Sequence, residues 1–233
     1  MGSEWRAIIF DFNGVISDDE PLHLEVMRRV LAEERIAISD EDYWTKYIGR
    51  DDRHCFTTAL TEAGREAPDQ ATLDNLLTRK TYYYLEAVAA GPQFFPGVIE
   101  LIERLASIYP LAIASGALRP EIEAVLAGGG IRDRFRVVIS SEDVSASKPD
   151  PEIYLHALAE LNASIEDAPS ISPFECLVIE DSRAGIKAAH RAGMRCLAVA
   201  TSFQAAALTE ADWVFENIAR IDPQIFDRVN KTR

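Results

Sequence analysis

The sequence predicts an α/β fold, in which a doubly wound parallel sheet carries a small α-helical domain inserted after its first strand. Short apolar segments alternate with longer segments whose apolar residues recur at helical spacing. Strands that are separated by helices form parallel sheets with helices on both faces. Between the first strand and about residue 90, however, only helical patterns occur. A helical insertion therefore interrupts the alternation.

Six apolar segments predict the strands of this sheet. The first ends at Phe10, and turn-forming or polar residues bound the others. The glycines at positions 128–130 are expected to end a helix that begins at Pro120. The remaining strands are expected at residues 111–115, 137–140, 177–180, 196–200 and 213–215. The other helices are expected at residues 22–33, 55–60, 73–88, 98–108, 151–161 and 183–192.

Proline and glycine residues mark the end of the helical insertion. The pairs Gly91-Pro92 and Pro96-Gly97 are typical of turns and linkers. We therefore expect a core domain of residues 1–16 and 96–233 and a helical domain of residues 17–95.

The composition is that of an ordinary globular protein with an excess of acidic residues. The formal net charge of −14 argues against nucleic acid or an anionic membrane as a partner, because both attract basic surfaces. No apolar segment approaches the length that spans a bilayer. The three cysteines have no CxxC spacing, so neither a disulfide framework nor a zinc site is expected. These features predict a cytoplasmic protein.

Polar motifs follow one another along the chain, and three of them lie at the ends of predicted strands. In open α/β sheets, ligands bind outside the carboxyl ends of the strands. Taken singly, each motif also fits a helix cap, a turn or a solvent-exposed charge. Their order along the chain indicates one site. The residues are Asp11, Ser115, Lys148 and the pair Glu180-Asp181.

This ordered set resembles the motifs of the haloacid dehalogenase superfamily. Within it, the set is similar to the subfamily I branch with a helical cap, which contains beta-phosphoglucomutase and phosphoglycolate phosphatase. The resemblance extends over nearly the whole chain and implies that the helical insertion closes over the site as a cap. It further implies a Mg²⁺-dependent phosphoryl-transfer hydrolase, a monomer that acts on a small phosphorylated metabolite such as a sugar phosphate. Within the cap, His23 and Arg50 lie where such proteins bind substrate.

The resemblance assigns a role to each motif of the core. Asp11 is expected to be the nucleophile that receives the phosphoryl group as an aspartyl-phosphate, a known role for Asp. Ser115 and the N–H group of Gly116 are expected to bind the phosphoryl oxygens. Lys148 is expected to balance the negative charge of Asp11 and of the phosphate.

A divalent cation is expected beside Asp11, because the Asp11 carboxylate and a phosphoryl group are both negatively charged and do not approach one another without a counter-ion. Mg²⁺ prefers oxygen ligands. By resemblance, Asp11, Asp181 and the backbone carbonyl of Asn13 would supply them, with Glu180 as a further ligand or bound through a water molecule. The carbonyl does not depend on the side chain, so Asn13 is expected to preserve metal binding.

Asn13 departs from the family pattern, which has a second Asp two residues after the nucleophile. That Asp protonates the leaving oxygen and then activates the attacking water or hydroxyl. Asn donates hydrogen bonds but transfers no proton at neutral pH, and general acid–base catalysis contributes a factor of about 10² to 10⁴. Impaired turnover is therefore expected. Three hypotheses remain open: a slowed phosphatase, a sugar-phosphate mutase of the beta-phosphoglucomutase kind, and a non-catalytic phosphate-binding protein.

Overall fold

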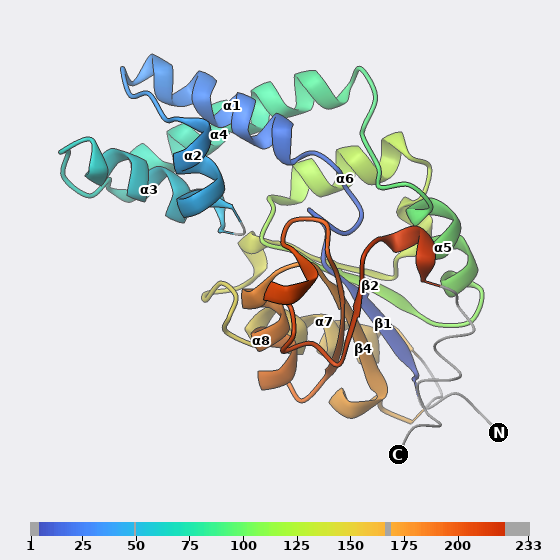
Figure 1. Cartoon of the computed structure of the whole chain (residues 1–233). Helices are drawn as coiled ribbons and strands as arrows, with labels where there is room; N and C mark the ends of the chain where they lie inside the picture. Colours follow the sequence, from blue (N-terminus) through green and yellow to red (C-terminus); the bar gives the residue numbers. More distant parts are fainter. Residues whose placement is uncertain (1–4, 49, 166–168, 222–233) are drawn as a thin grey trace.

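A parallel sheet forms the centre of the protein (Figure 1). The computed structural model describes residues 5–48, 50–165 and 169–221, so both ends of the predicted core domain lie outside the described residues. Within the described part, six strands pair in the order β3-β2-β1-β4-β5-β6, the predicted doubly wound arrangement. The strands are β1 (Ala7–Phe10), β2 (Leu111–Ala114), β3 (Val137–Ile139), β4 (Cys176–Glu180), β5 (Arg195–Val199) and β6 (Trp213–Phe215).

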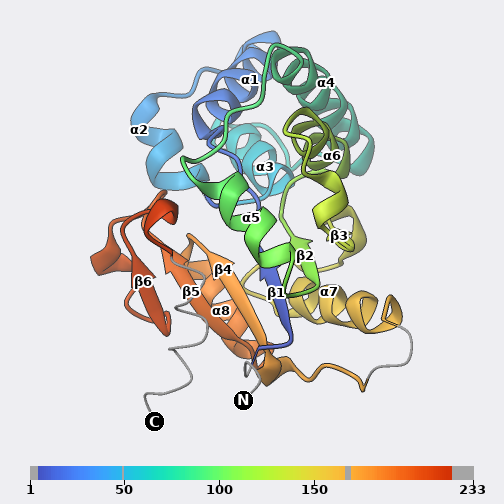
Figure 2. The same cartoon turned by 90° about the vertical axis from the view of Figure 1, so that its right-hand side faces the viewer.

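Helices cover both faces of the sheet. They are α5 (Val98–Ala106), α6 (Arg119–Gly128), α7 (Glu152–Ala163) and α8 (Arg183–Arg191). Successive residues of a strand point to opposite faces, so a strand covered on both sides is apolar throughout. Ile8 and Phe10 of β1 pack in a cluster with α5 and α6, whereas Ala7 and Ile9 pack in another with α7 and α8. Figure 2 shows α5 in front of the strands and α8 behind them.

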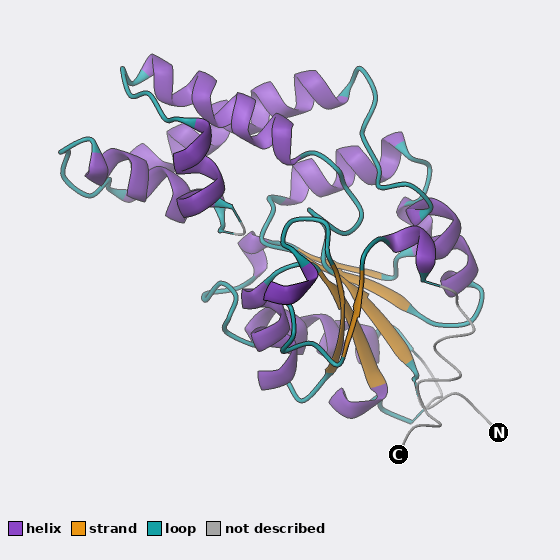
Figure 3. Cartoon of the chain, in the orientation of Figure 1, coloured by secondary structure: helices purple, strands orange, loops and turns teal. Residues whose placement is uncertain are grey.

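The segment between β1 and α5 is helical, as predicted. Its helices are α1 (Glu20–Glu33), α2 (Asp40–Asp42), α3 (Asp52–Glu62) and α4 (Gln70–Val88). They enclose an apolar cluster of their own, which includes Leu31, Phe56 and Leu76. This part is therefore a helical cap, separate from the orange strands in Figure 3. No helix in the described part of the chain is long and apolar enough to cross a membrane.

Short helical turns also occur, which the apolar pattern does not predict. A π-helical turn at Tyr43–Tyr47 continues α2. Such turns are too short to show a periodic pattern in the sequence. Further turns of 3₁₀ type lie at Arg132–Arg134, Ser141–Asp143, Pro173–Glu175, Ala205–Ala207 and Ile218–Arg220.

The two connections between core and cap run side by side. The N–H group of Asp18 donates to the carbonyl of Gln93 at 3.1 Å, and that of Phe95 donates to the carbonyl of Ile16 at 3.3 Å. We propose that the domain boundaries lie in these two connections, where the chain leaves and re-enters the core.

The glycines that were expected to end a helix also make room for the second connection. Helix α6 ends at Gly128, as predicted. A Cβ atom on Gly129 would lie 2.4 Å from the ring of Phe94, and one on Gly128 would lie 2.8 Å from the ring of Pro92. The missing side chains therefore let this connection pack against the end of α6.

A buried ion pair joins the cap to the core. The ammonium group of Lys80 on α4 lies 2.8 Å from a carboxylate oxygen of Glu121 on α6, and these side chains are 1% and 0% exposed. Lys80 also contacts Asp52 on α3 at 2.8 Å, and Thr81 donates to Glu121 at 3.3 Å. A buried charge is costly unless it is paired. The pairing therefore favours docking of α4 on α6.

We expect Glu121→Ala to lower the free energy of unfolding by about 3 kcal/mol, because it leaves the buried ammonium group of Lys80 with one partner fewer. Glu123→Ala, on the same helix, removes a partly exposed pair with Arg132 and should cost less than about 1 kcal/mol. Urea unfolding followed by circular dichroism measures both values. Equal losses in the two variants would contradict a larger contribution from the buried pair.

Candidate active site

The pairing register of three neighbouring strands brings the predicted motifs to one edge of the sheet. Phe10 of β1 pairs with Ile113 of β2 on one side and with Ile179 of β4 on the other. The next residue, Asp11, therefore lies level with Glu180, and its N–H group donates to the carbonyl of Ile179 at 2.9 Å. The strand order reverses between β1 and β4, which is where open α/β sheets bind ligands.

Three carboxylates gather at this edge. Oxygen atoms of Asp11, Glu180 and Asp181 lie within 4.8 Å of one another. Burial raises the pKa of Asp11 to about 7, since the opposing effect of Lys148 is incomplete and the charge of Glu180 adds to the rise. Burial and the charges of Glu180 and Asp11 also hold the pKa of Asp181 well above its usual range. This cluster combines the oxygen ligands of a hard-metal site with an excess of negative charge.

Glu180 is the most completely bonded of the three. One of its oxygens accepts from Lys148 at 2.8 Å and from the Tyr154 hydroxyl at 2.9 Å. The other accepts from the N–H groups of Asp181 and Ser182 at 2.8 Å each, and from the Ser182 hydroxyl at 2.9 Å. Burial opposes ionisation of Glu180, but Lys148 and these N–H groups outweigh it and lower its pKa. The carboxylate therefore stays ionised although its side chain is 0% exposed.

Lys148 lies between two of the carboxylates. Its ammonium nitrogen is 2.9 Å from Asp11 and 2.8 Å from Glu180, and its side chain is only 12% exposed. The loop that carries it is anchored to the start of α7, because the N–H groups of Ser145 and Ala146 donate to the carboxylate of Glu152 at 3.0 and 2.8 Å. Lys148 is thus a fixed counter-charge and not a solvent-exposed loop residue.

Two glycines allow the backbone to pass close to these carboxylates. Gly14 has a φ of +76°, and a Cβ atom there would lie 1.9 Å from an oxygen of Asp181. A Cβ atom on Gly185, in the first turn of α8, would lie 1.6 Å from an oxygen of Glu180. Any larger residue at either position would displace a carboxylate of the cluster.

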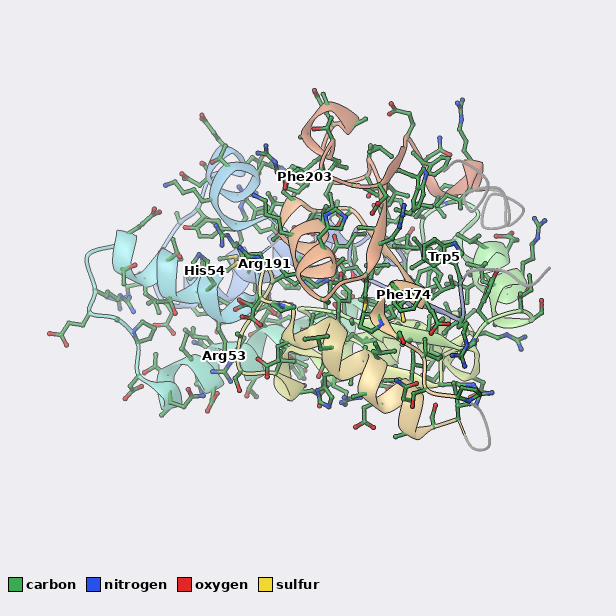
Figure 4. The ribbon with its side chains drawn as sticks, turned by 90° about the horizontal axis from the view of Figure 1, so that it is seen from below. Trp5, Arg53, His54, Phe174, Arg191 and Phe203 are labelled. Atoms are coloured by element: carbon green, nitrogen blue, oxygen red, sulfur yellow. The ribbon has the colours of Figure 1, made fainter. Side chains whose placement is uncertain are left out.

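A cavity of about 410 Å³ lies above the cluster and is lined by both the core and the cap. Figure 4 labels three of its lining residues, Arg53 and His54 on α3 and Phe203 on the loop after β5. Glu180 is buried beneath the cavity, but the other predicted site residues line it. They are Asp11, Asn13, His23, Arg50, Ser115, Gly116, Lys148 and Asp181.

Ser115 lies in the cavity wall and does not cap the following helix. The residue before the first turn of α6 is Leu118, whose side chain makes no capping hydrogen bond. The Ser115 oxygen instead accepts from the N–H group of Ala117 at 3.1 Å, within the turn that follows β2. Gly116, in the same turn, is exposed. Among the described residues, the N–H group of Gly116 donates no backbone hydrogen bond.

Asn13 belongs to a buried polar network at the junction with the cap. Its amide nitrogen donates to Asp19 at 3.0 Å and lies 2.9 Å from Nε2 of His23. The Tyr84 hydroxyl donates to the other oxygen of Asp19, and the rings of His23 and Tyr84 stack 4.9 Å apart. Burial opposes ionisation of Asp19, but His23 and the hydrogen bonds outweigh it and lower its pKa. Burial and Lys80 disfavour protonation of His23, yet the charge of Asp19 raises its pKa overall.

The sequence analysis did not identify several of these contributors. Tyr84 and Tyr154 reach the site through packing between distant segments, and no local pattern marks them. Asp19 lies in the segment that follows Asn13. The spacing of Asp19 and His23, one helical turn apart, is the single available signal. His54 also lines the cavity, from an exposed position.

Comparison with known proteins identifies the family to which this chain belongs. A family model described as haloacid dehalogenase-like hydrolase matches residues 8–199. The chain belongs to this family. Protein CbbY from Rhodobacter capsulatus is 31% identical over 227 residues, covering 90% of this chain and 92% of the relative. A phosphoglycolate phosphatase from Yersinia pseudotuberculosis is 28% identical, covering 94% and 93%.

Solved structures of other proteins share the fold. A beta-phosphoglucomutase from Clostridium difficile superimposes with a TM-score of 0.85 at 23% identity, covering 97% of this chain and 98% of that one. CbbY from Rhodobacter sphaeroides, in complex with phosphate, gives a TM-score of 0.80 at 25% identity, covering 93% and 96%. The predicted fold and family are therefore confirmed, and the relatives support a phosphatase or a mutase. The roles of individual site residues stay predictions.

The raised pKa of Asp11 predicts how stability depends on pH when a chelator is present. The folded protein holds this proton up to pH about 7, whereas the unfolded chain releases it near the ordinary value of 3.8. The free energy of unfolding should therefore fall as the pH rises from about 4 to about 7. Urea unfolding across this range should show a smaller fall for Asp11→Asn, and an unchanged fall for the control Asp18→Asn, whose side chain is exposed. The same slope in wild type and Asp11→Asn would contradict the assignment.

Proposed function

We propose that this protein is a Mg²⁺-dependent phosphatase that acts on a small phosphorylated metabolite through an aspartyl-phosphate on Asp11. The observation that carries the proposal is the convergence of Asp11, Lys148 and Asp181 on one cavity between the core and the cap. Family membership and the phosphatase relatives support the same class of reaction.

The oxygen atoms at the bottom of the cavity fit Mg²⁺. The carboxylates of Asp11 and Asp181, with the backbone carbonyl of Asn13, would hold the ion, which favours oxygen ligands. Both oxygens of Glu180 already accept hydrogen bonds, so Glu180 would act through a bridging water molecule and by fixing Lys148. When bound, the ion would neutralise the negative charges of the carboxylates and of the phosphoryl oxygens.

In the first step, a carboxylate oxygen of Asp11 attacks the phosphorus atom and the bond to the ester oxygen breaks. Lys148 is already placed beside that carboxylate, and it compensates the charge of the incoming group. The Ser115 hydroxyl and the N–H group of Gly116 bind the phosphoryl oxygens. In the second step, water attacks the phosphorus atom of the aspartyl-phosphate, the bond to Asp11 breaks, and phosphate leaves.

Asn13 limits this cycle, because its amide transfers no proton at neutral pH. Loss of a general acid and base costs a factor of about 10² to 10⁴ in rate. An ester with a good leaving group needs no acid for the first step. Hydrolysis of the aspartyl-phosphate still lacks its base and should limit turnover.

The substrate is expected to be a small phosphorylated sugar or a similar metabolite. CbbY from Rhodobacter sphaeroides has been solved with phosphate and, as an Asp-to-Asn mutant, with xylulose-(1,5)bisphosphate. In the present chain, His23 and Arg50 line the cavity from the cap side and would contact the part of the substrate beyond the phosphate. A cavity of about 410 Å³ is at the small end of the usual range for ligand sites.

An activated aryl phosphate should give a rapid burst of about one product per protein molecule, followed by slow turnover. The burst requires Mg²⁺ and should vanish with chelator and in Asp11→Asn. Rapid-quench kinetics measures the burst, and mass spectrometry of the quenched protein should locate one phosphoryl group on Asp11. Fast steady turnover without a phosphorylated protein would contradict the proposed limitation by Asn13.

Asn13→Asp should raise steady-state hydrolysis by a factor of about 10² to 10⁴, because a carboxylate at this position transfers protons. A panel of sugar phosphates measures the gain. Because Asn-Gly sequences deamidate, mass spectrometry must first show that the wild-type sample retains Asn13. No gain on any ester would favour a non-catalytic phosphate-binding protein, and a requirement for a bisphosphate primer would favour a mutase.

A further inference from the structure

The orientation of the Asn13 amide follows from its neighbours. An ionised carboxylate only accepts hydrogen bonds, so the amide atom 3.0 Å from Asp19 must be the nitrogen. The same nitrogen lies 2.9 Å from Nε2 of His23, a contact whose direction depends on the protonation of the imidazole. The contact with Asp19 is sufficient to fix which side of the amide faces the cap.

The amide oxygen is thereby left on the other side. No hydrogen bond from the described residues reaches this oxygen, although Asn13 lines the cavity together with Asp11. The oxygen is therefore the atom of the Asn13 amide that has no hydrogen-bond partner among the described residues.

We infer that Asn13 is a fixed hydrogen-bond acceptor that orients the attacking water molecule, and that Asp19 and His23 are the residues that position its amide. This inference rests on the proposed function and concerns its second step. Water donates one O–H group to the Asn13 oxygen while its own oxygen attacks the phosphorus atom. The aspartyl-phosphate and water yield the Asp11 carboxylate and dihydrogen phosphate, so both protons leave with the product and Asn13 carries none.

The residues that hold the amide are themselves held by buried groups. Asp19 is 4% exposed and accepts a second hydrogen bond from the Tyr84 hydroxyl. The Tyr84 ring stacks on His23, and the ammonium group of Lys80 lies 5.2 Å from the ring centre. Lys80 is in turn paired with Glu121 of the core. Since misplacement of a reacting group by about 1 Å can cost a factor of about 10², this frame supplies the precision that an orienting residue needs.

Asp19→Asn tests the inference, because a second amide no longer dictates which atom of Asn13 faces it. We expect breakdown of the aspartyl-phosphate to slow at least about tenfold, while the size of the burst stays unchanged. Asp18→Asn is the matched control: it removes the same charge from the neighbouring exposed residue, which makes no side-chain contact with Asn13 among the described residues. Rapid-quench measurement of phosphoenzyme decay compares the three proteins.

A double-mutant cycle separates positioning from a merely structural effect. In an Asn13→Ala background, Asp19→Asn should have no further effect on decay, because the group it positions is gone. The same slowing in both backgrounds, or no slowing in either, would overturn the inference. Absence of any phosphoenzyme in wild type would instead reject the proposed function and the orienting role with it.

A measurement on the wild-type protein covers the case in which Asp19→Asn does not fold. The side-chain amide signals of Asn13 in a ¹⁵N spectrum are identified by their loss in Asn13→Asp. The proton donated to Asp19 should exchange with solvent much more slowly than those of Asn217, whose side chain is exposed. Equally fast exchange at both positions would overturn the fixed orientation of the amide.

Discussion

Burial of three carboxylates at the ends of two neighbouring strands constrains most of the structure around them. Removing each charge from water costs several kcal/mol unless it is compensated. Glu180 is compensated by Lys148, Tyr154 and the N–H groups at the start of α8, where the helix dipole also favours a negative group. Lys148 and the backbone N–H group of Phe12 compensate Asp11 incompletely, so its pKa remains raised, as does that of Asp181. The three carboxylates therefore carry more negative charge than Lys148 compensates, and a bound metal ion would supply the missing positive charge.

The parts of the fold that depend on local sequence were predictable. The apolar segment before Asp11 and the one that ends at Glu180 are the neighbouring strands β1 and β4, between which the strand order reverses. Helix α6 ends at Gly128. Ser182, a residue type that favours the first position before a helix, accepts from the N–H group of Gly185. Each of these features is determined by a few neighbouring residues: an apolar segment forms a strand, Ser182 caps a helix, and glycine ends one.

The parts that depend on contacts between distant segments were not predictable. In the sequence, Lys80 is one of several charged residues on a helix, and only the docking of α4 on α6 makes it a buried partner of Glu121. Tyr154 likewise reaches Glu180 across 26 positions of the chain. The same limit applies to the substrate: the core motifs follow strand ends and define the reaction class, whereas the cavity wall on the cap side comes from helix positions that show no motif. Family membership therefore limits the class of reaction more closely than it limits the identity of the substrate.

Asn13 shows why replacing an acid by its amide need not disturb such a site. The backbone carbonyl is retained, and a neutral side chain adds no charge to a cluster in which the pKa of Asp11 and that of Asp181 are already raised. The amide also donates to Asp19, a carboxylate that is buried at the junction and needs donors of its own. A carboxylate at position 13 would face Asp19 with a like charge unless one of the two held a proton. The Asn13 amide thus transfers no proton at neutral pH, but it supplies a hydrogen bond to the buried Asp19 carboxylate.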